Sequence, residues 1–388
     1  MNETAMRLAG GVALLACCGI ACALELPAEI REKIFKPTAD VRLAHETVQV
    51  PMRGEDRNGF YECPYFRVYV NGKGPFTFLF DTGSSSTLVS DRVVEAARPT
   101  VAFDRGGERD VVRLESVEFG ELTLRDVWAI HQDGFDVDGV LGFQAFGLNP
   151  FAIDFVTRVL TVGSQPSPSA RSFELPYEAP RHVPLVPIAI GGRRLPILVD
   201  TGDDAYGLEL RGEELADARV DHVPVAAATV LNGTVGQTTR VTTLVDDVVL
   251  GPVRAQSAVI GVNDDLPVGD LGYDALRQFR VMFDPVRRVA RFEPSFEGDV
   301  FSLSGERVAG FSLKFDDSGE VTRVTRESPA EAAGIAVGDQ ILAIEGQAVS
   351  GFSRRHWDEV VQRSRAMKLR WRHGSEIRSA EVMTTALH

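Results

Sequence analysis

The sequence has very little cysteine. Three of its four cysteines, Cys17, Cys18 and Cys22, lie near the N-terminus, which leaves Cys63 alone in the rest of the chain. A single thiol cannot form an internal disulfide, even in an oxidising compartment. No neighbouring motif supplies the base that a cysteine nucleophile needs, so we expect Cys63 to be a buried or idle thiol.

Other common chemical motifs are also missing. The seven histidines are scattered, without a His-Glu-x-x-His motif or a pair at metal-ligand spacing, so we expect no zinc site and no other cofactor. No Gly-x-Ser-x-Gly elbow and no phosphate-binding glycine loop occurs. With 41 basic and 55 acidic residues, the formal net charge of −14 disfavours a nucleic-acid partner.

Long apolar runs are confined to the N-terminus. Residues 1–23 hold a single arginine, an apolar run and the small residues 21–23. This pattern predicts a secretory signal peptide cleaved before Leu24, and hence a periplasmic or extracellular protein. Two alternatives stay open: residues 14–17 are similar to a bacterial lipobox, which would put a lipid anchor on Cys17, or the run is a buried helix. The run is too short and glycine-rich for a good membrane span, and no other transmembrane candidate follows.

What the chain does contain is an internal repeat. Residues 77–86 and 196–205 each show an apolar strand pattern followed by Asp-Thr-Gly, at Asp81 and at Asp200. Asp-Thr-Gly alone is weak evidence, but the similarity extends upstream without gaps and resumes downstream. The aligned pairs are Gly72 and Gly191, Phe76 and Leu195, Phe78 and Ile197, Leu79 and Leu198, Phe80 and Val199, the segments 139–146 and 269–276, and Asp154 and Asp284. We infer a duplicated domain of roughly 120 residues, enough to enclose its own core.

The repeat sets the expected domain boundaries. We predict a first lobe at 24–162, a polar linker with two prolines at 163–172, a second lobe at 173–297 and a further module at 298–388. Both lobes carry short β-branched and aromatic runs punctuated by glycine and asparagine, which predicts a strand-rich structure.

Two kinds of hairpin are expected within the lobes. Residues 66–70 and 76–80 flank an Asn71-Gly72 turn, which predicts a hairpin leading into the first Asp-Thr-Gly. Residues 105–107 in the first copy and 231–236 in the second have the composition of hairpin tips.

The two aspartates have a shared chemical use if the fold brings them together. Two carboxylates in one site cannot both stay ionised, so Asp81 and Asp200 would share a proton and titrate as a pair. The ionised member can then take a proton from water while the protonated member polarises a carbonyl. The glycines permit a tight turn, and the threonine hydroxyls can hydrogen-bond between the two loops. The alternative for each aspartate is a solvated turn residue after a strand.

These segments resemble the active-site loops of the aspartic protease family, and the resemblance covers both copies. It implies a mainly β, bilobal acid-protease fold built from two tandem retropepsin-like β-barrel lobes. It also implies an aspartic endopeptidase whose catalytic residues are Asp81 and Asp200. Because one chain supplies both aspartates, a monomer would suffice. The residues that the resemblance assigns to loop support are Thr82, Gly83, Ser84, Thr201, Gly202 and Asp203.

The second loop departs from the family pattern. Serine, threonine or alanine usually follows Asp-Thr-Gly, whereas Asp203 stands there, followed by Asp204. A third carboxylate beside the pair would raise its pKa values and move its working range toward neutral pH, unless Asp203 turns outward to solvent. The alternative function is therefore a non-catalytic envelope protein that binds peptides with a degenerate second site.

The C-terminal module has signals of its own. Ser328 is followed by Pro329 and Glu331, a capping box with proline at the first helical position, and Gly334 can end that short helix. A strand is expected at residues 340–344. A helix is expected at 353–365, with Trp357, Val360 and Val361 on one face.

The module resembles a PDZ domain of the kind carried by bacterial envelope proteases, a small α/β fold. In this resemblance, Gly310, Phe311, Ser312 and Leu313 form the loop that binds a peptide carboxylate, although glycine is more usual at position 312. Backbone amides of this loop would hold the C-terminus of a peptide that adds a strand to the sheet. An empty or self-occupied groove is the alternative.

Overall fold

A computed structural model gives the fold of the chain. It describes residues 26–53, 63–105, 109–180, 182–203, 206–221, 225–231, 234–303, 307–314, 318–324, 328–353, 356–357, 360–361, 364 and 366–386. The predicted signal peptide with Cys17, and parts of both predicted hairpin tips, lie outside these residues. Within them, no helix has the length and hydropathy needed to cross a membrane. The described structure is mainly β, as predicted.

Lobe 1, the first copy, is built around an eight-stranded sheet in the order β1-β8-β5-β9-β4-β3-β7-β6. An additional pairing between β7 and β8 curls this sheet toward a barrel. The elements of lobe 1 are α2 (Ala28–Phe35), β1 (Asp40–Leu43), β2 (Thr47–Pro51), β3 (Tyr65–Val70), β4 (Lys73–Asp81), β5 (Thr87–Val89), α3 (Asp91–Ala97), β6 (Thr100–Phe103), β7 (Val111–Phe119), β8 (Leu122–His131), β9 (Gly139–Gly142), η1 (Phe143–Phe146), β10 (Phe151–Asp154) and β11 (Val159–Gly163).

Lobe 2, the second copy, has a nine-stranded sheet in the order β16-β17-β20-β15-β21-β14-β13-β18-β19. Strand β14 of this sheet corresponds to β4 of lobe 1, and β21 corresponds to β9. The elements of lobe 2 are β12 (Phe173–Pro176), β13 (Leu185–Ile190), β14 (Arg193–Val199), β15 (Glu209–Leu210), η2 (Gly212–Leu215), β16 (Val225–Leu231), β17 (Thr234–Thr243), β18 (Val248–Leu250), β19 (Val253–Ala255), β20 (Val259–Val262), β21 (Asp270–Leu271), α4 (Tyr273–Leu276), β22 (Phe279–Asp284) and β23 (Val289–Pro294).

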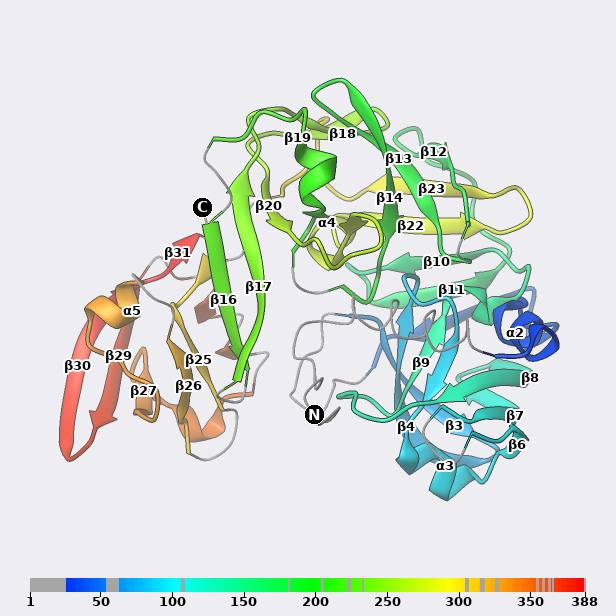
Figure 1. Cartoon of the computed structure of the whole chain (residues 1–388), viewed down its shortest axis with the longest axis horizontal. Helices are drawn as coiled ribbons and strands as arrows, with labels where there is room; N and C mark the ends of the chain where they lie inside the picture. Colours follow the sequence, from blue (N-terminus) through cyan, green and yellow to red (C-terminus); the bar gives the residue numbers. More distant parts are fainter. Residues whose placement is uncertain are drawn as a thin grey trace.

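A six-stranded sheet joins the two lobes, in the order β12-β23-β22-β10-β11-β2 (Figure 1). Its central pair comes from different copies, because β10 of lobe 1 pairs antiparallel with β22 of lobe 2. In this pair Phe151 lies opposite Phe283, with their ring centroids 5.2 Å apart. The aromatic side chains around them belong to one apolar cluster that draws residues from both lobes. The two copies therefore form one packed body, which fixes their Asp-Thr-Gly loops relative to each other.

The predicted hairpin before the first Asp-Thr-Gly is present as β3 and β4. Its turn residues Asn71 and Gly72 have φ values of 49° and 70°. Such left-handed conformations are typical of the tight turn that an Asn-Gly pair favours. Along β4, Phe76, Phe78 and Phe80 belong to the core cluster shared by the lobes. The hairpin is thus anchored by alternate side chains, and its last residue is Asp81.

The C-terminal module has a separate core. Its apolar cluster includes Phe311, Ile341, Trp357 and Trp371, and none of its members belongs to the cluster of the lobes. The elements of the module are β24 (Arg307–Val308), β25 (Phe311–Leu313), β26 (Val321–Val324), α5 (Pro329–Ala332), β27 (Gln340–Ile344), β28 (Gln347–Ala348), η3 (Val349–Gly351), β29 (Ala366–His373), β30 (Glu376–Met383) and β31 (Thr385–Ala386).

The local signals read in the module's sequence correspond to its structure. Ser328 is the N-cap of α5, and its hydroxyl accepts a hydrogen bond from the amide of Glu331 at 3.2 Å. Strand β27 spans the predicted segment 340–344. Of the described residues in the predicted 353–365 helix, 356, 357, 360 and 361 are helical and 353 and 364 are not; Trp357 is buried.

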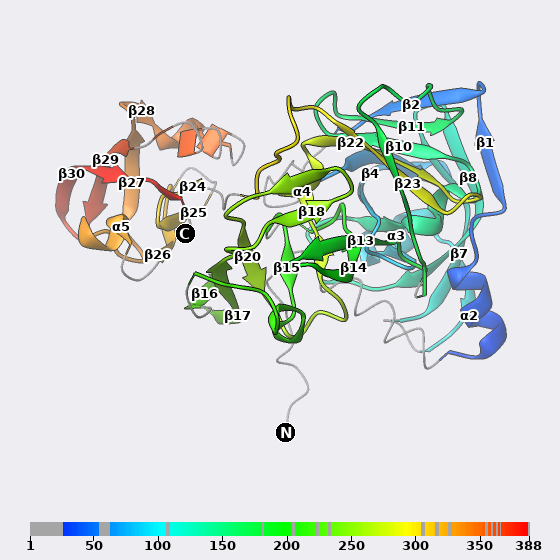
Figure 2. The same cartoon turned by 90° about the horizontal axis from the view of Figure 1, so that it is seen from above.

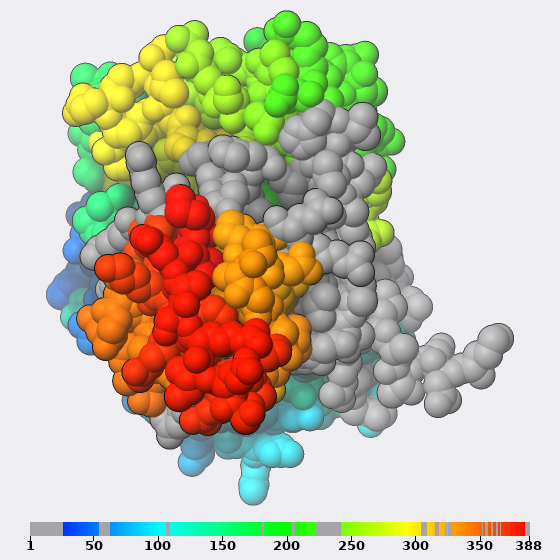
Figure 3. All heavy atoms as spheres, turned by 90° about the vertical axis from the view of Figure 1, so that its left-hand side faces the viewer, coloured from blue at the N-terminus to red at the C-terminus, as the bar shows by residue number. Residues whose placement is uncertain are grey.

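The module lies beside lobe 2 (Figure 2), and its strand β26 contacts β16. Seen from the left-hand side of Figure 1, the module stands in front of the lobes (Figure 3). The segment between them belongs with lobe 2, because Phe301 and Leu303 join the core of the lobes. The amide of Val259 donates to the carbonyl of Leu303 at 2.7 Å. By packing, the lobe therefore extends to residue 303, beyond the predicted boundary at 297.

Candidate active site

The two Asp-Thr-Gly loops occupy equivalent positions in the two lobes. Asp81 ends β4, which runs parallel to β9, and lies opposite Gly142. Asp200 directly follows β14, which runs parallel to β21. Both side chains are buried, with exposed fractions of 0% for Asp81 and 1% for Asp200. The duplication thus brings the two predicted catalytic aspartates into one buried site.

Each aspartate is held by backbone amides of its own loop. Asp81 Oδ1 accepts hydrogen bonds from Gly83 N at 2.8 Å and from Ser84 N at 3.1 Å. In the second loop, Asp200 Oδ1 accepts from Gly202 N at 2.8 Å and from Asp203 N at 3.2 Å. The residue after Asp-Thr-Gly therefore contributes its amide in both loops, and an aspartate can fill this role as well as a serine.

The two carboxyl groups influence each other's protonation. Burial raises the pKa of Asp81, and the charge of Asp200 and a hydrogen bond with its carboxyl raise this pKa further. Burial also raises the pKa of Asp200, while the hydrogen bond with Asp81 and the loop amides act against that rise. The pKa of Asp81 is therefore raised more strongly than the pKa of Asp200. Because the groups interact strongly, the pair titrates as a unit.

Reciprocal threonine contacts tie the loops together. The amide of Thr82 donates to Thr201 Oγ1 at 3.0 Å, and the amide of Thr201 donates to Thr82 Oγ1 at 3.1 Å. Each hydroxyl in turn donates to a carbonyl of the opposite lobe: Thr82 to Val199 at 2.6 Å, and Thr201 to Phe80 at 2.9 Å. The predicted hydrogen bonding between loops therefore occurs in both directions and fixes the distance between the aspartates.

Gly83 allows the loops to approach closely. A Cβ atom at this position would lie 2.1 Å from Asp200 Oδ2, far inside contact distance. Any side chain here would push the second carboxylate away from the first. Glycine at position 83 is thus required by the geometry of the pair.

Each lobe presents one face of its sheet to the dyad, and we call this the dyad face. Alternate residues of a strand point to opposite faces, so Leu79 shares the face of Asp81, while Phe78 and Phe80 point into the core. In lobe 1 the dyad face carries Leu79, Leu88, Ile130 and Val140. These side chains belong to an apolar cluster that also contains Leu26 and Ile34 of the N-terminal segment.

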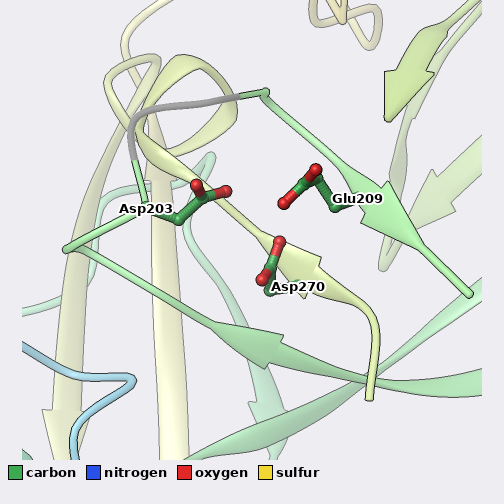
Figure 4. A group of neighbouring side chains, drawn as sticks. All are labelled: Asp203, Glu209 and Asp270. Carbon is green, nitrogen blue, oxygen red and sulfur yellow. The ribbon is translucent and has the colours of Figure 1, made fainter. Parts of the chain in front are cut away.

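The dyad face of lobe 2 is acidic. By strand register, Leu198, Glu209, Gly261 and Asp270 stand where lobe 1 has Leu79, Leu88, Ile130 and Val140. Asp203, in the place of Ser84, turns its carboxylate toward Glu209 and Asp270 (Figure 4). Carboxylate oxygens of Asp203, Glu209 and Asp270 lie within 4.8 Å of one another, and all three residues are buried. We refer to them as the acidic triad.

The position of Asp203 differs from one sequence expectation. Its side chain has an exposed fraction of 0%, so it does not turn outward to solvent. Its carboxylate also points toward the other members of the triad (Figure 4), and its contact with Asp200 is made by the amide. Its charge is still linked to the dyad, because both Asp203 and Asp200 raise the pKa of Asp270. A shift of the dyad toward neutral pH by Asp203 stays a prediction.

Glu209 and Asp270 were not among the predicted site residues. The aligned repeat holds a signal for Asp270, because this aspartate faces the apolar Val140. Glu209 could be found only from the strand register, since the loop before it is longer in lobe 2. The lone thiol is buried as expected, and Cys63 Sγ lies 3.8 Å from the carbonyl oxygen of Gly202.

The predicted carboxylate-binding loop lies at the start of β25. Gly310 has a φ of 78°, and a Cβ there would lie 2.6 Å from Ser328 Oγ, so only glycine fits without strain. Phe311 and Leu313 are buried in the module's core, whereas Ser312 is partly exposed. One edge of β25 is paired, to β26. The four predicted residues thus form a turn that enters a strand.

Comparison with known families agrees with this architecture. Residues 66–145 match the family model of an aspartyl protease, a span that contains the first Asp-Thr-Gly loop and β9. Residues 320–372 match a PDZ domain model. The search of curated proteins finds no matching sequence. The chain therefore carries a retropepsin-like aspartyl protease domain followed by a C-terminal PDZ domain.

Proposed function

We propose that this protein is an aspartic endopeptidase in which Asp81 and Asp200 activate a water molecule for attack on a peptide bond. The observation that carries the proposal is the pair of loops, tied by reciprocal threonine hydrogen bonds, that holds two buried carboxyls in one site, where each raises or lowers the pKa of the other. Aspartates that served only in turns would stay exposed to solvent, because burying two carboxyl groups costs free energy. An aspartyl protease domain supports the same reaction class.

The chemistry follows from the single shared proton. The ionised carboxylate removes a proton from water, and the protonated carboxyl donates to the carbonyl oxygen of the peptide bond. When the tetrahedral intermediate collapses and the C–N bond breaks, the carboxyl that took the proton from water gives it to the leaving nitrogen. The other carboxylate takes its proton back from the hydroxyl of the intermediate, which becomes the new carboxyl group of the product. Both aspartates are buried, so a substrate reaches them by displacing whatever covers the dyad face. On lobe 1 the described part of that cover includes Leu26 and Ile34.

The other domain and the N-terminus extend this proposal. The PDZ domain would bind the C-terminal end of a peptide through residues 310–313 and so recruit a substrate or regulate the lobes. The N-terminal pattern supports export to the periplasm or beyond the cell, with a lipid anchor on Cys17 as the alternative form. In both cases the substrates would be peptides or proteins outside the cytoplasm.

Asp81→Asn tests the proposal directly. The amide keeps the shape of the carboxyl but cannot carry the shared proton, so hydrolysis of an unfolded protein substrate should fall by about 100- to 10,000-fold. Glu297→Gln removes a charge from an exposed side chain and serves as the matched control. The assay compares both variants with the wild type from pH 3 to 8, with circular dichroism to verify folding.

Two results would argue against the proposal. A folded Asp81→Asn variant with wild-type turnover would rule out the aspartic mechanism. A wild-type protein that binds peptides tightly but cleaves none at any pH would favour the alternative, a peptide-binding protein with a degenerate second site.

A further inference from the structure

We propose that the dyad face of lobe 2 is a specificity subsite for a positively charged side chain, lysine or arginine, of the residue on one side of the scissile bond. The equivalent face of lobe 1 would then receive an apolar side chain on the other side. This inference rests on the proposed protease function, because it names the class of substrate for the same site.

The first step is the location of the acidic triad beside the dyad. Leu208, Leu210 and Leu271, the chain neighbours of Glu209 and Asp270, belong to the core cluster. Since side chains alternate along a strand, Glu209 and Asp270 point to the opposite face, which they share with Asp200. Strand β21 is hydrogen-bonded to β14, the strand that leads into Asp200. A chain lying across the dyad would therefore pass over these carboxylates.

The second step is that the corresponding face of lobe 1 already binds a separate chain segment. Leu26 and Ile34 come from the N-terminal segment before the sheet of lobe 1 begins. Their side chains are 6% and 1% exposed and share one apolar cluster with Leu88 and Val140. The dyad face of lobe 1 is thus a surface on which apolar side chains of another segment pack. The equivalent face of lobe 2 has the same backbone framework but different chemistry.

The third step concerns the kind of ligand that the acidic side chains of lobe 2 can bind. Asp270 is 1% exposed, and its Oδ1 has no hydrogen-bond partner among the described residues. Its carboxylate is directed toward Asp203 and Glu209 (Figure 4). Burial and the charges of Asp203, Glu209 and Asp200 raise the pKa of Asp270, and a cation beside it would act in the opposite direction and favour its ionised form. An ammonium or guanidinium group supplies only donors, which suits a group of carboxylate acceptors.

Glycines make the acidic arrangement possible. A Cβ at Gly272 would lie 2.4 Å from Asp203 Oδ2, and a Cβ at Gly261 would lie 2.8 Å from Glu209 Oε1. Lobe 1 has isoleucine, Ile130, at the position of Gly261. The acidic side chains therefore occupy space that a side chain from β20 would otherwise fill. The glycines of lobe 2 thus leave the space that the acidic side chains occupy on its dyad face.

The test is a comparison of substrates that differ in one side chain. A peptide cleaved by the wild type is resynthesised with lysine, arginine, norleucine or glutamate at each residue flanking the bond. We expect lysine or arginine at one position to raise kcat/KM over norleucine by about tenfold to a hundredfold, as charge-assisted hydrogen bonds would. Asp270→Val and Glu209→Leu, which install the lobe 1 residues, should reverse this preference toward norleucine.

Controls separate this result from a loss of folding. Asp270→Asn keeps the size of the side chain and should lose most of the preference even if Asp270→Val is unstable. Glu297→Gln should leave the preference unchanged. Binding of the same fluorescent peptides is also measured on Asp81→Asn by anisotropy, because this readout needs no hydrolysis. If no peptide is cleaved, the protease proposal fails. The preference in peptide binding then decides alone whether the face of lobe 2 is a subsite for basic side chains.

Three outcomes would overturn the inference. The first is equal use of lysine and norleucine at every position by the wild type. The second is a lysine preference that persists in Asp270→Asn and Glu209→Leu. The third is binding of Ca²⁺ or Mg²⁺ to the wild type, abolished in Asp270→Asn, without any preference for basic peptides. That third result would identify the triad as a metal site.

Discussion

At the scale of single residues, burial changes the pKa of the dyad and of Asp270 in the acidic triad in the same direction. Burial raises the pKa of Asp81, Asp200 and Asp270 alike. The difference lies in their hydrogen bonds. Each dyad carboxylate accepts two loop amides, whereas Asp270 interacts with the carboxyls of Asp203 and Glu209. The dyad can therefore keep one negative charge, but ionisation of Asp270 places charges of the same sign together.

This difference predicts how stability changes with pH. The folded-state pKa of Asp270 is raised above its unfolded value of 3.8, so its contribution to stability is complete below that value and is lost as the pH rises through the folded pKa. Asp270→Asn removes this loss. We expect the melting temperature of the variant, relative to the wild type, to increase as the pH rises from 3.5 to 8. Differential scanning fluorimetry measures it, and a difference that is constant across this range would contradict the assignment.

At the scale of elements, the loops depend on hydrogen bonds that cross between the lobes. Thr201 Oγ1 accepts from the amide of Thr82 and donates to the carbonyl of Phe80, and all three groups are buried. Thr201→Val keeps the shape but leaves that amide and that carbonyl without partners. Leaving buried polar groups unpaired costs about 1–3 kcal/mol of unfolding free energy each.

We therefore expect Thr201→Val to lower both stability and activity, whereas Thr201→Ser, which keeps the hydroxyl, should retain most of both. Urea unfolding and kcat/KM on one peptide provide the two readouts. Equal losses in the valine and serine variants would show that packing of the methyl group, and not the hydroxyl, holds the loops together.

The same elements show what the sequence could predict. The repeat located both Asp-Thr-Gly loops, and the Asn71-Gly72 turn located the hairpin before the first one, because these signals are local. The pairing of β10 with β22 joins strands from different copies, and no spacing in the sequence encodes it. The packing of Leu26 and Ile34 on lobe 1 was not predicted, because no local motif marks the surface on which these side chains pack. Long-range packing and register thus decide the parts of the site that lie beyond the loops.

At the scale of the whole molecule, the lobes and the PDZ domain have separate cores, and the connection between them belongs to lobe 2. Phe301 packs in the core of the lobes. Gln278 bonds to both the amide and the carbonyl of Ser302, at 2.8 and 2.7 Å. A truncation that separates the domains should therefore end after Leu303. Ending at Pro294 would remove apolar side chains from the core of the lobes.

We expect the protein truncated after Leu303 to cleave a short peptide at close to the wild-type rate, because no dyad residue lies beyond that point. Its binding of a longer substrate with a free apolar C-terminus should weaken. The form that ends at Pro294 should melt at a lower temperature. If the form that ends at Leu303 is folded but inactive on every peptide, the PDZ domain is needed to organise the lobes and does more than recruit.

The difference between the two dyad faces has a consequence for how such a site can evolve. In a homodimer of single lobes, one gene encodes both halves, so rotational symmetry copies every mutation of a recognition surface onto the other side. Here the halves lie on one chain, and Val140 and Asp270 could diverge independently. In the proposed peptidase, fusion of the duplicated gene would thus remove the symmetry from substrate recognition, so that the two sides of a peptide bond could be distinguished.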